Sequence, residues 1–255
     1  MKKLIIILIS VIFCFPQFSK AQNAAGFKPF SFGLKAIPSL SFIKSNVKDF
    51  KNANPALNFG YGLMAEFNFA PNYGFFTGIE INDNRGNIDY DRNVSKIYYF
   101  KDGDFKTPPF KIVSREYSIK YLNIPLLLKL KTNEIGVLKY FGQFGIDAGF
   151  RLKATATDKD TTGLQNPDVS IDSDINLIRL ALNIGLGAEY NLSGNTSIVF
   201  GLNYSNGFTN FLKKESKYLY VDKSIAPYSD GTPKNPKLAQ NAYNSYVALT
   251  VGILF

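Results

Sequence analysis

Apolar and polar residues alternate with a period of two along most of the chain. The clearest segment is residues 243–255, where one parity is mainly apolar and the other small or polar; its apolar positions include Val247, Leu249, Val251, Ile253 and Phe255. Successive side chains of a β-strand point to opposite faces, so this pattern predicts a strand with one apolar face. Seven more segments alternate in the same way, namely residues 30–42, 58–69, 74–82, 116–130, 140–154, 177–190 and 197–207. No stretch after Gln22 shows the spacing of an amphipathic helix, so the sequence predicts eight strands and an all-β fold.

The predicted connections between these strands alternate between long and short. The long ones are residues 43–57, 83–115, 155–176 and 208–241, and the short ones are residues 70–73, 131–139 and 191–196. Transmembrane β-barrels have an even number of strands, with short turns in the periplasm and long loops outside the cell. The sequence therefore predicts an eight-stranded antiparallel up-and-down transmembrane β-barrel with long extracellular loops and both termini in the periplasm.

The charged residues fall almost entirely on one face of the predicted strands. These candidate lumen residues are Lys35, Glu66, Glu80, Lys129, Asp147, Arg151, Lys153, Arg179 and Glu189. The interior of an eight-stranded barrel is just wide enough for side chains, and unpaired buried charges are costly, so we expect these charges to pair. The opposite faces carry almost no charge, as contact with lipid requires. A soluble barrel or sandwich is the alternative, but a soluble carrier would point its apolar residues inward.

The first residues have the pattern of a secretory signal peptide. Lys2 and Lys3 precede an apolar run at residues 4–15, and Ser19 and Ala21 place small residues at positions −3 and −1 before an expected cut between Ala21 and Gln22. A helical membrane span needs ~20 residues, which disfavours the alternative of an N-terminal anchor. We therefore expect residues 1–21 to be removed and residues 22–255 to form a single barrel domain.

The composition excludes several kinds of chemistry. The chain has no His and one Cys, Cys14, which lies in the predicted signal peptide. Catalysis by a Ser-His-Asp triad, His-ligated zinc and a disulfide framework are therefore excluded. Asp147 and Glu189 could form an acid–base pair, but nearby Arg151 and Arg179 favour structural ion pairs. The sequence predicts no enzymatic activity and no cofactor.

The net charge of +9 does not indicate nucleic-acid binding. Removal of residues 1–21 leaves 26 basic and 20 acidic residues, a net charge of +6. The basic residues are scattered, and an exported protein does not normally meet nucleic acid. A better explanation for the basic loop 208–241 is attraction to phosphorylated lipopolysaccharide, or simple solubility.

The acidic loop at residues 155–176 offers one candidate metal site. Residues 158–163 begin like a calcium loop, with Asp158 and Asp160 at the first and third positions and Gly163 at the sixth. Val169 occupies the twelfth position, where a bidentate glutamate belongs, so a solvated acidic loop is the favoured interpretation.

Two short motifs resemble those of known outer-membrane proteins. The run Tyr121-Leu-Asn-Ile-Pro-Leu-Leu-Leu-Lys129 resembles the YLEIPLLLK strand of the PorT-like outer-membrane barrel family, with Asn123 where that family usually has Glu. The terminal residues Val251, Ile253 and Phe255 resemble the signal that the barrel-assembly machinery reads. Within the first motif, Pro125 cannot donate to a ladder, so we expect a bulge or kink there.

The PorT-like resemblance implies a non-enzymatic accessory role in type IX secretion or surface-protein assembly. The alternatives are a structural or adhesive barrel with no secretion role and a small-solute channel, which a charge-filled lumen disfavours. The expected partners are outer-membrane lipid and lipopolysaccharide, the barrel-assembly machinery during insertion, and other type IX secretion or envelope proteins.

Overall fold

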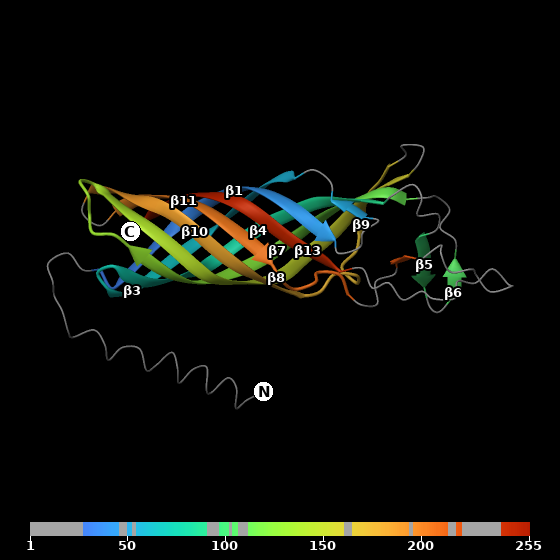
Figure 1. Cartoon of the computed structure of the whole chain (residues 1–255), viewed down its shortest axis with the longest axis horizontal. Helices are drawn as coiled ribbons and strands as arrows, with labels where there is room; N and C mark the ends of the chain where they lie inside the picture. The colour runs from blue at the N-terminus through green and yellow to red at the C-terminus, as the bar shows by residue number, and fades with distance from the viewer. Residues whose placement is uncertain are drawn as a thin grey trace, which may run out of the picture.

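In the computed structural model, eight long antiparallel strands form one closed barrel (Figure 1). The structure describes residues 28–45, 50–52, 55–90, 97–101, 104–106, 112–160, 165–193, 196–213, 218–220 and 241–255. The barrel strands are β1 (Phe30–Ser45), β3 (Ala56–Ala70), β4 (Tyr73–Tyr90), β7 (Ile112–Lys131), β8 (Leu138–Asp160), β10 (Ile178–Ser193), β11 (Thr196–Gly207) and β13 (Ala242–Leu254). Each pairs with the next barrel strand along the chain, and β13 pairs with β1 to close the barrel. The prediction of an eight-stranded up-and-down barrel is confirmed.

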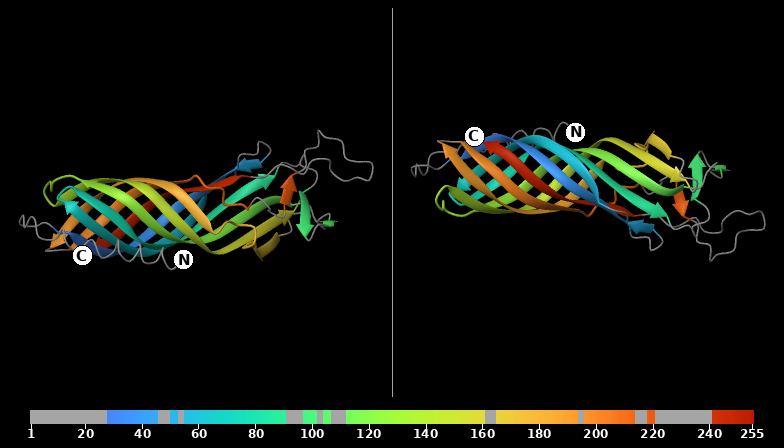
Figure 2. Two further views of the ribbon diagram at one scale, coloured as in Figure 1. Left: turned by 90° about the horizontal axis from the view of Figure 1, so that it is seen from below. Right: turned by 90° about the horizontal axis from the view of Figure 1, so that it is seen from above.

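Both ends of the barrel wall lie beside the short turns. The backbone amide of Phe255 donates to the carbonyl of Phe32 at 2.7 Å, and Phe30 lies opposite Phe67, close to the turn that joins β3 to β4. Figure 2 shows the C-terminus at the end of the barrel far from β5, β6 and β12. The predicted signal peptide and its cut between Ala21 and Gln22 lie outside the described residues.

Three barrel strands continue further into the long-loop end than predicted. The predicted strands over residues 74–82 and 140–154 stop at residues 82 and 154, and the one over residues 116–130 begins at residue 116. In the structure, β4, β7 and β8 continue past these points as a paired ladder whose outward positions are mostly polar. Five short strands also lie in the long connections: β2 (Phe50–Asn52), β5 (Ile97–Lys101), β6 (Asp104–Lys106), β9 (Gln165–Ser170) and β12 (Tyr218–Tyr220). Of these, β5, β6 and β12 form a separate small sheet, while β2 and β9 extend the barrel wall. No helix in the described part of the chain is long and apolar enough to span a membrane.

The barrel is apolar outside and polar inside. Large apolar side chains such as Leu57, Leu63 and Leu186 are more than half exposed on the outer wall. Charged side chains such as Glu66 and Arg179 are almost fully buried within the barrel. Because a soluble protein distributes these residue types in the opposite way, the outer wall has the chemistry of a surface in contact with lipid.

Strand β8 contains a bulge that reverses its inward and outward faces. Tyr121 pairs with Arg151, but the preceding residue Lys120 pairs with Lys153, so Leu152 is the extra residue. Beyond the bulge, Ala154 faces inward at 0% exposure and Lys153 is exposed on the outer wall. The placement of Lys153 in the lumen, expected from uninterrupted alternation, is therefore wrong.

We expected a bulge or a kink at Pro125, and the structure shows no bulge there. Pro125 pairs with Asp147 of β8 in unbroken register. On the other side, the ladder to β4 lacks paired residues between Phe76↔Leu127 and Glu80↔Asn123, but the register on both sides of this gap is the same. The missing backbone N–H therefore interrupts the pairing without shifting it.

Candidate functional site

Four charged side chains form a closed cluster in the lumen near the short turns, which we call the basal ion cluster. Its members are Glu66 (β3), Lys129 and Lys131 (β7), and Glu189 (β10). Lys129 Nζ lies 2.8 Å from Glu66 Oε2 and also contacts Glu189, while Lys131 contacts Glu66 and lies 3.4 Å from Glu189. Two positive and two negative charges thus neutralise each other, as burial at this depth requires.

Aromatic rings enclose the ammonium group of Lys129. Its Nζ lies 4.2 Å from the ring centre of Phe141 and 5.7 Å from that of Phe76. A ring face attracts a cation, so these contacts add to the ion pairs. Lys28 precedes β1 and so lies outside the membrane-spanning strands; partial burial, and then the nearby ammonium group of Lys139, lower its pKa.

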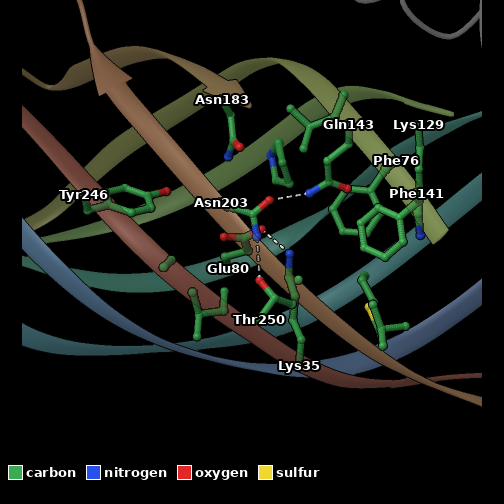
Figure 3. A pocket seen from close by; sticks show the side chains of 17 residues that line it. Lys35, Phe76, Glu80, Lys129, Phe141, Gln143, Asn183, Asn203, Tyr246 and Thr250 are labelled. Atoms are coloured by element: carbon green, nitrogen blue, oxygen red, sulfur yellow. Dashed lines mark hydrogen bonds and ion pairs between the residues drawn. The ribbon is translucent and has the colours of Figure 1, made fainter. Parts of the chain in front are cut away.

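A second ion pair and a chain of amides fill the middle of the lumen (Figure 3). Lys35 contacts Glu80, and its Nζ lies 4.7 Å from the ring centre of Phe76. Gln143 donates to Asn203 at 2.6 Å, and Asn203 donates to Thr250 at 2.9 Å. The cavity between them measures about 30 Å³, which is room for only about two water molecules.

Asp147 is held by uncharged donors rather than by an arginine. It accepts hydrogen bonds from Asn183 at 2.9 Å, Tyr246 at 3.2 Å and Ser205 at 3.3 Å. Arg179 lies on the same side of the lumen, where it donates to Ser205 at 3.1 Å and its guanidinium lies 5.3 Å from the ring centre of Tyr246. The expected direct pair between Asp147 and an arginine does not occur among the described contacts.

Apolar residues close the long-loop end of the barrel, forming what we call the mouth plug. This buried cluster consists of Ile43, Ile88, Tyr117, Ile119, Tyr121, Ala154, Ala156, Ile171, Ile175, Phe211, Leu212 and Ala242. Ile171 and Ile175 come from the connection between β8 and β10, and Phe211 and Leu212 from the connection between β11 and β13. These two segments lie across the opening and bury their side chains against the inner wall.

Backbone hydrogen bonds hold the two segments of the mouth plug together. Ile175 forms a β-bridge with Leu212, and Asn176 N donates to Phe211 O at 2.7 Å. Asn176 Nδ2 also donates to the carbonyls of Asn210 and Leu212, at 2.8 and 3.2 Å. Backbone groups of both segments are thus paired with each other, as buried backbone groups require.

Two acidic residues of the 155–176 segment, Asp158 and Asp172, are bound to arginines. Arg115 donates two hydrogen bonds to the buried Asp158, from Nε at 2.5 Å and from Nη2 at 2.7 Å. Arg151 contacts Asp172, which also accepts from the backbone amide of Ala154 at 2.8 Å. Within the described residues, no group of three or more acidic, Cys or His side chains could hold a metal ion. Residues 161–164 lie outside the described part.

Seven of the nine candidate lumen residues are buried in the barrel: Lys35, Glu66, Glu80, Lys129, Asp147, Arg179 and Glu189. Arg151 is partly buried and pairs with a loop residue, whereas Lys153 is outside. The expected ion pairs with arginines form for neither carboxylate: Asp147 is held by uncharged donors, and the partners of Glu189 are Lys129 and Lys131.

Three further charged residues of the lumen were not expected from the sequence pattern: Lys131, Arg115 and Asp158. Lys131 has the same parity as Lys129, so extending the strand by one residue would have found it. Arg115 and Asp158 lie in the part of β7 and β8 that was taken for loop. The terminal residues Val251 and Ile253 pair with β1 and β11 as ordinary wall residues, and Phe255 lies beside Phe32.

A protein-family model for the outer membrane protein β-barrel domain matches residues 20–213. Among curated proteins, none matches the sequence. Similar solved structures include the outer membrane protein OprG from Pseudomonas aeruginosa, with 12% identity, a TM-score of 0.43, and coverage of 88% of this chain and 93% of that one. Neisserial surface protein A has 9% identity, a TM-score of 0.39, and coverage of 88% and 96%. The structure of Ail, the attachment invasion locus protein of Yersinia pestis, in complex with a heparin analogue has 12% identity, a TM-score of 0.38, and coverage of 89% and 100%.

Proposed function

Because this chain belongs to the outer membrane protein β-barrel domain family, we propose that it is a non-enzymatic accessory barrel that serves surface-protein assembly, specifically type IX secretion. As an integral outer-membrane protein it has two surfaces available to partners, the long loops and the short turns. The proposal is that other envelope proteins bind there.

The observation that carries this proposal is the closed lumen. The basal ion cluster fills the end near the short turns, the cavity in the middle measures about 30 Å³, and the mouth plug covers the other end. A solute would have to displace neutralised ion pairs and a buried apolar cluster in order to pass, which argues against a channel. The outer surfaces therefore remain as the places where the protein acts.

The proposed orientation places the long loops outside the cell and both termini in the periplasm. It is supported by the arrangement of known barrels, whose short turns are periplasmic, and by the position of Phe32 and Phe255 beside the short turns. The barrel-assembly machinery would then meet Val251, Ile253 and Phe255 from the periplasmic side during insertion.

A non-enzymatic role is supported by the complete absence of His and by the engagement of the buried acids. Asp147 is held by three hydrogen bonds, Glu189 by two lysines, and Asp158 by a bidentate arginine. Carboxylates fixed in this way have a structural role rather than one as exchangeable acids and bases.

The type IX assignment is supported by the PorT-like run at residues 121–129. In the structure this run lies in the C-terminal half of β7, where Asn123 and Lys129 are buried in the lumen and Leu126 faces outward. The run therefore helps to build the wall and the basal ion cluster. The support that this run gives to the proposed function is its sequence resemblance, since Pro125 leaves the register of the wall unchanged.

A clean deletion of the gene, followed by comparison of secreted and surface proteins, tests the proposal. We expect loss of a whole class of type IX cargo while the other outer-membrane proteins remain at their normal levels, and we expect the full-length chain to restore that cargo. An unchanged set of secreted proteins would overturn the secretion role and favour a structural or adhesive barrel.

A further inference from the structure

Two lysines lie directly opposite each other on the outer wall. The bulge at Leu152 turns Lys153 outward, and Lys153 pairs in the ladder with Lys120 of β7. Both side chains are exposed, and within the described part of the chain neither forms a hydrogen bond or an ion pair. Like charges directly opposite on neighbouring strands destabilise a sheet. Because neither lysine has an ion-pair partner among the described residues, the pair lacks a counter-charge.

Asp83, the neighbour on β4, does not supply that counter-charge. It pairs with Lys120 in the ladder, but its carboxylate accepts from Arg85 at 2.8 and 3.0 Å and from Ser118 at 3.1 Å. The guanidinium side chain of Arg85 is 47% exposed. Around Lys120 and Lys153, three cations thus meet one carboxylate, which leaves a local positive excess. The next outward carboxylate on β7, Glu116, lies two outward positions beyond Lys120 and pairs in the ladder with Asn87 and Thr157.

These cations lie at the edge of the apolar belt. On β7, the outward positions from Leu122 to Leu130 are apolar, and Lys120 is the next outward residue. A transmembrane β-strand needs ~9–11 residues, which is the length of that apolar run. On β8, Phe150 and Leu152 are exposed just below Lys153. The ammonium groups therefore stand at the level of lipid headgroups, directly above a surface for acyl chains.

We propose that Lys120, Lys153 and Arg85 bind a phosphate group of a phosphorylated membrane glycolipid, whose acyl chains lie along the apolar residues below them. A phosphate anion would neutralise the two opposed lysines and accept charge-assisted hydrogen bonds from all three side chains. This inference rests on the proposed function only for the side of the membrane: with the long loops outside, the lipid is the glycolipid of the outer leaflet.

The test measures binding of lipid A carrying two phosphates to the folded full-length barrel in detergent, by native mass spectrometry. The double variant K120Q/K153Q is expected to bind about 10- to 30-fold more weakly than the wild type. The control variant K44Q/K139Q removes the same number of charges: Lys44 is exposed on β1, across the barrel, and Lys139 lies near the short turns. It is expected to bind within about twofold of the wild type.

Two further probes on the wild-type chain identify the ligand chemistry, whatever the behaviour of the variants. Lipid A without phosphates, which keeps the acyl chains, should bind as weakly as phosphorylated lipid A binds the double variant. Inorganic phosphate at the concentration of the lipid should not compete. Equal binding of the two forms of lipid A, unchanged affinity of K120Q/K153Q, or full competition by inorganic phosphate would each overturn the proposal. Because binding in detergent does not depend on secreted cargo, its failure is distinct from failure of the deletion test.

Discussion

Lys129 and Glu66 form a buried ion pair across the barrel lumen, with Nζ and Oε2 2.8 Å apart. Glu66 lies on β3 and Lys129 on β7, and these strands are separated in the wall by β4. Glu189 contacts the same ammonium group from β10, which lies beyond β8 on the other side. The lysine therefore joins three strands that do not touch one another through backbone pairing.

Replacing Lys129 by Met should strongly destabilise the barrel. Glu66 and Glu189 would then share only Lys131, and a buried charge without its partner costs about 3–5 kcal/mol. Unfolding in urea can be followed by the shift between folded and unfolded bands on a gel, since the chain has no Trp to provide a fluorescence signal. The control K139M breaks only the half-exposed pair with Glu134 and should change stability by less than about 1 kcal/mol.

The second variant, K129M/E66Q, separates lost pairing from lost packing. It removes one charge of each sign, so Glu189 keeps Lys131 and much of the stability should return. If K129M unfolded at the same urea concentration as K139M, the basal ion cluster would not contribute to stability.

Replacing Phe211 by Ala should loosen the mouth plug without unfolding the barrel. Phe211 is 1% exposed, and its ring meets that of Tyr117 edge-on, with ring centres 5.5 Å apart. Replacing a buried Phe by Ala typically lowers the free energy of unfolding by about 3–5 kcal/mol. Here we expect the loss to weaken the packing of the two segments of the mouth plug. Limited proteolysis of the folded protein should cut F211A faster in the 208–241 loop. The control F208A truncates a half-exposed side chain and should behave as the wild type; equal cutting of both variants would contradict a closed mouth.

The wild-type barrel should not conduct ions in a planar lipid bilayer. The ion clusters and the amides fill its lumen, and the cavity that remains is closed off by the mouth plug. F211A should not conduct ions either, because the basal ion cluster still blocks the end of the lumen near the short turns. Stable conductance steps from the purified wild-type protein, at a size that scales with salt, would overturn the conclusion that the lumen is closed.

The sequence could predict the strands because lipid and a filled lumen impose a simple alternation. Residues that face lipid, such as Leu122 and Leu130, are apolar, whereas residues that face the lumen, such as Lys129 and Glu66, are charged. The period of two and the position of the charges therefore predict both the strands of the wall and the face to which each residue points. The same reasoning failed where those constraints end. Above the apolar belt the two faces exchange character: Tyr117 and Ile119 face inward into the mouth plug, and the outer positions are mostly polar. Arg115 and Asp158 lie in this part of the wall, where an apolar outer face no longer marks the strand.

The pairing of the lumen charges could not be read from the sequence either. Parity determines that Asp147 and Glu189 face inward, but the residue that each meets depends on strand stagger and on bulges. The bulge at Leu152 carries no Gly or Pro to reveal it, and it moved Lys153 to the opposite face. One extra residue is enough to exchange the two faces of the rest of a strand.

Cysteine cross-linking can test this bulge directly. Ser118 pairs with Thr155 in the observed register, whereas without the bulge it would pair with Ala154. The variant S118C/T155C should form a disulfide on the outer wall, because directly paired residues lie within the distance that a disulfide spans. S118C/A154C should remain reduced, since Ala154 faces the lumen. Thiol titration of the purified proteins distinguishes them, and the reverse pattern would show that β8 runs without a bulge.

Labelling of single cysteines on intact cells decides which end of the barrel faces outward. Lys213 is exposed beside the mouth plug, and Glu134 is exposed in the connection between β7 and β8, at the opposite end. Once the segment containing Cys14 is removed, neither site competes with a native thiol. With the proposed orientation, a membrane-impermeant maleimide should label K213C on intact cells, whereas E134C should require disruption of the outer membrane. Labelling of E134C alone would invert the topology, placing the mouth plug in the periplasm and the pair of Lys120 and Lys153 at the inner leaflet. The lipid that those lysines bind would then be a phospholipid rather than the outer glycolipid, so this measurement also determines which membrane leaflet supplies their ligand.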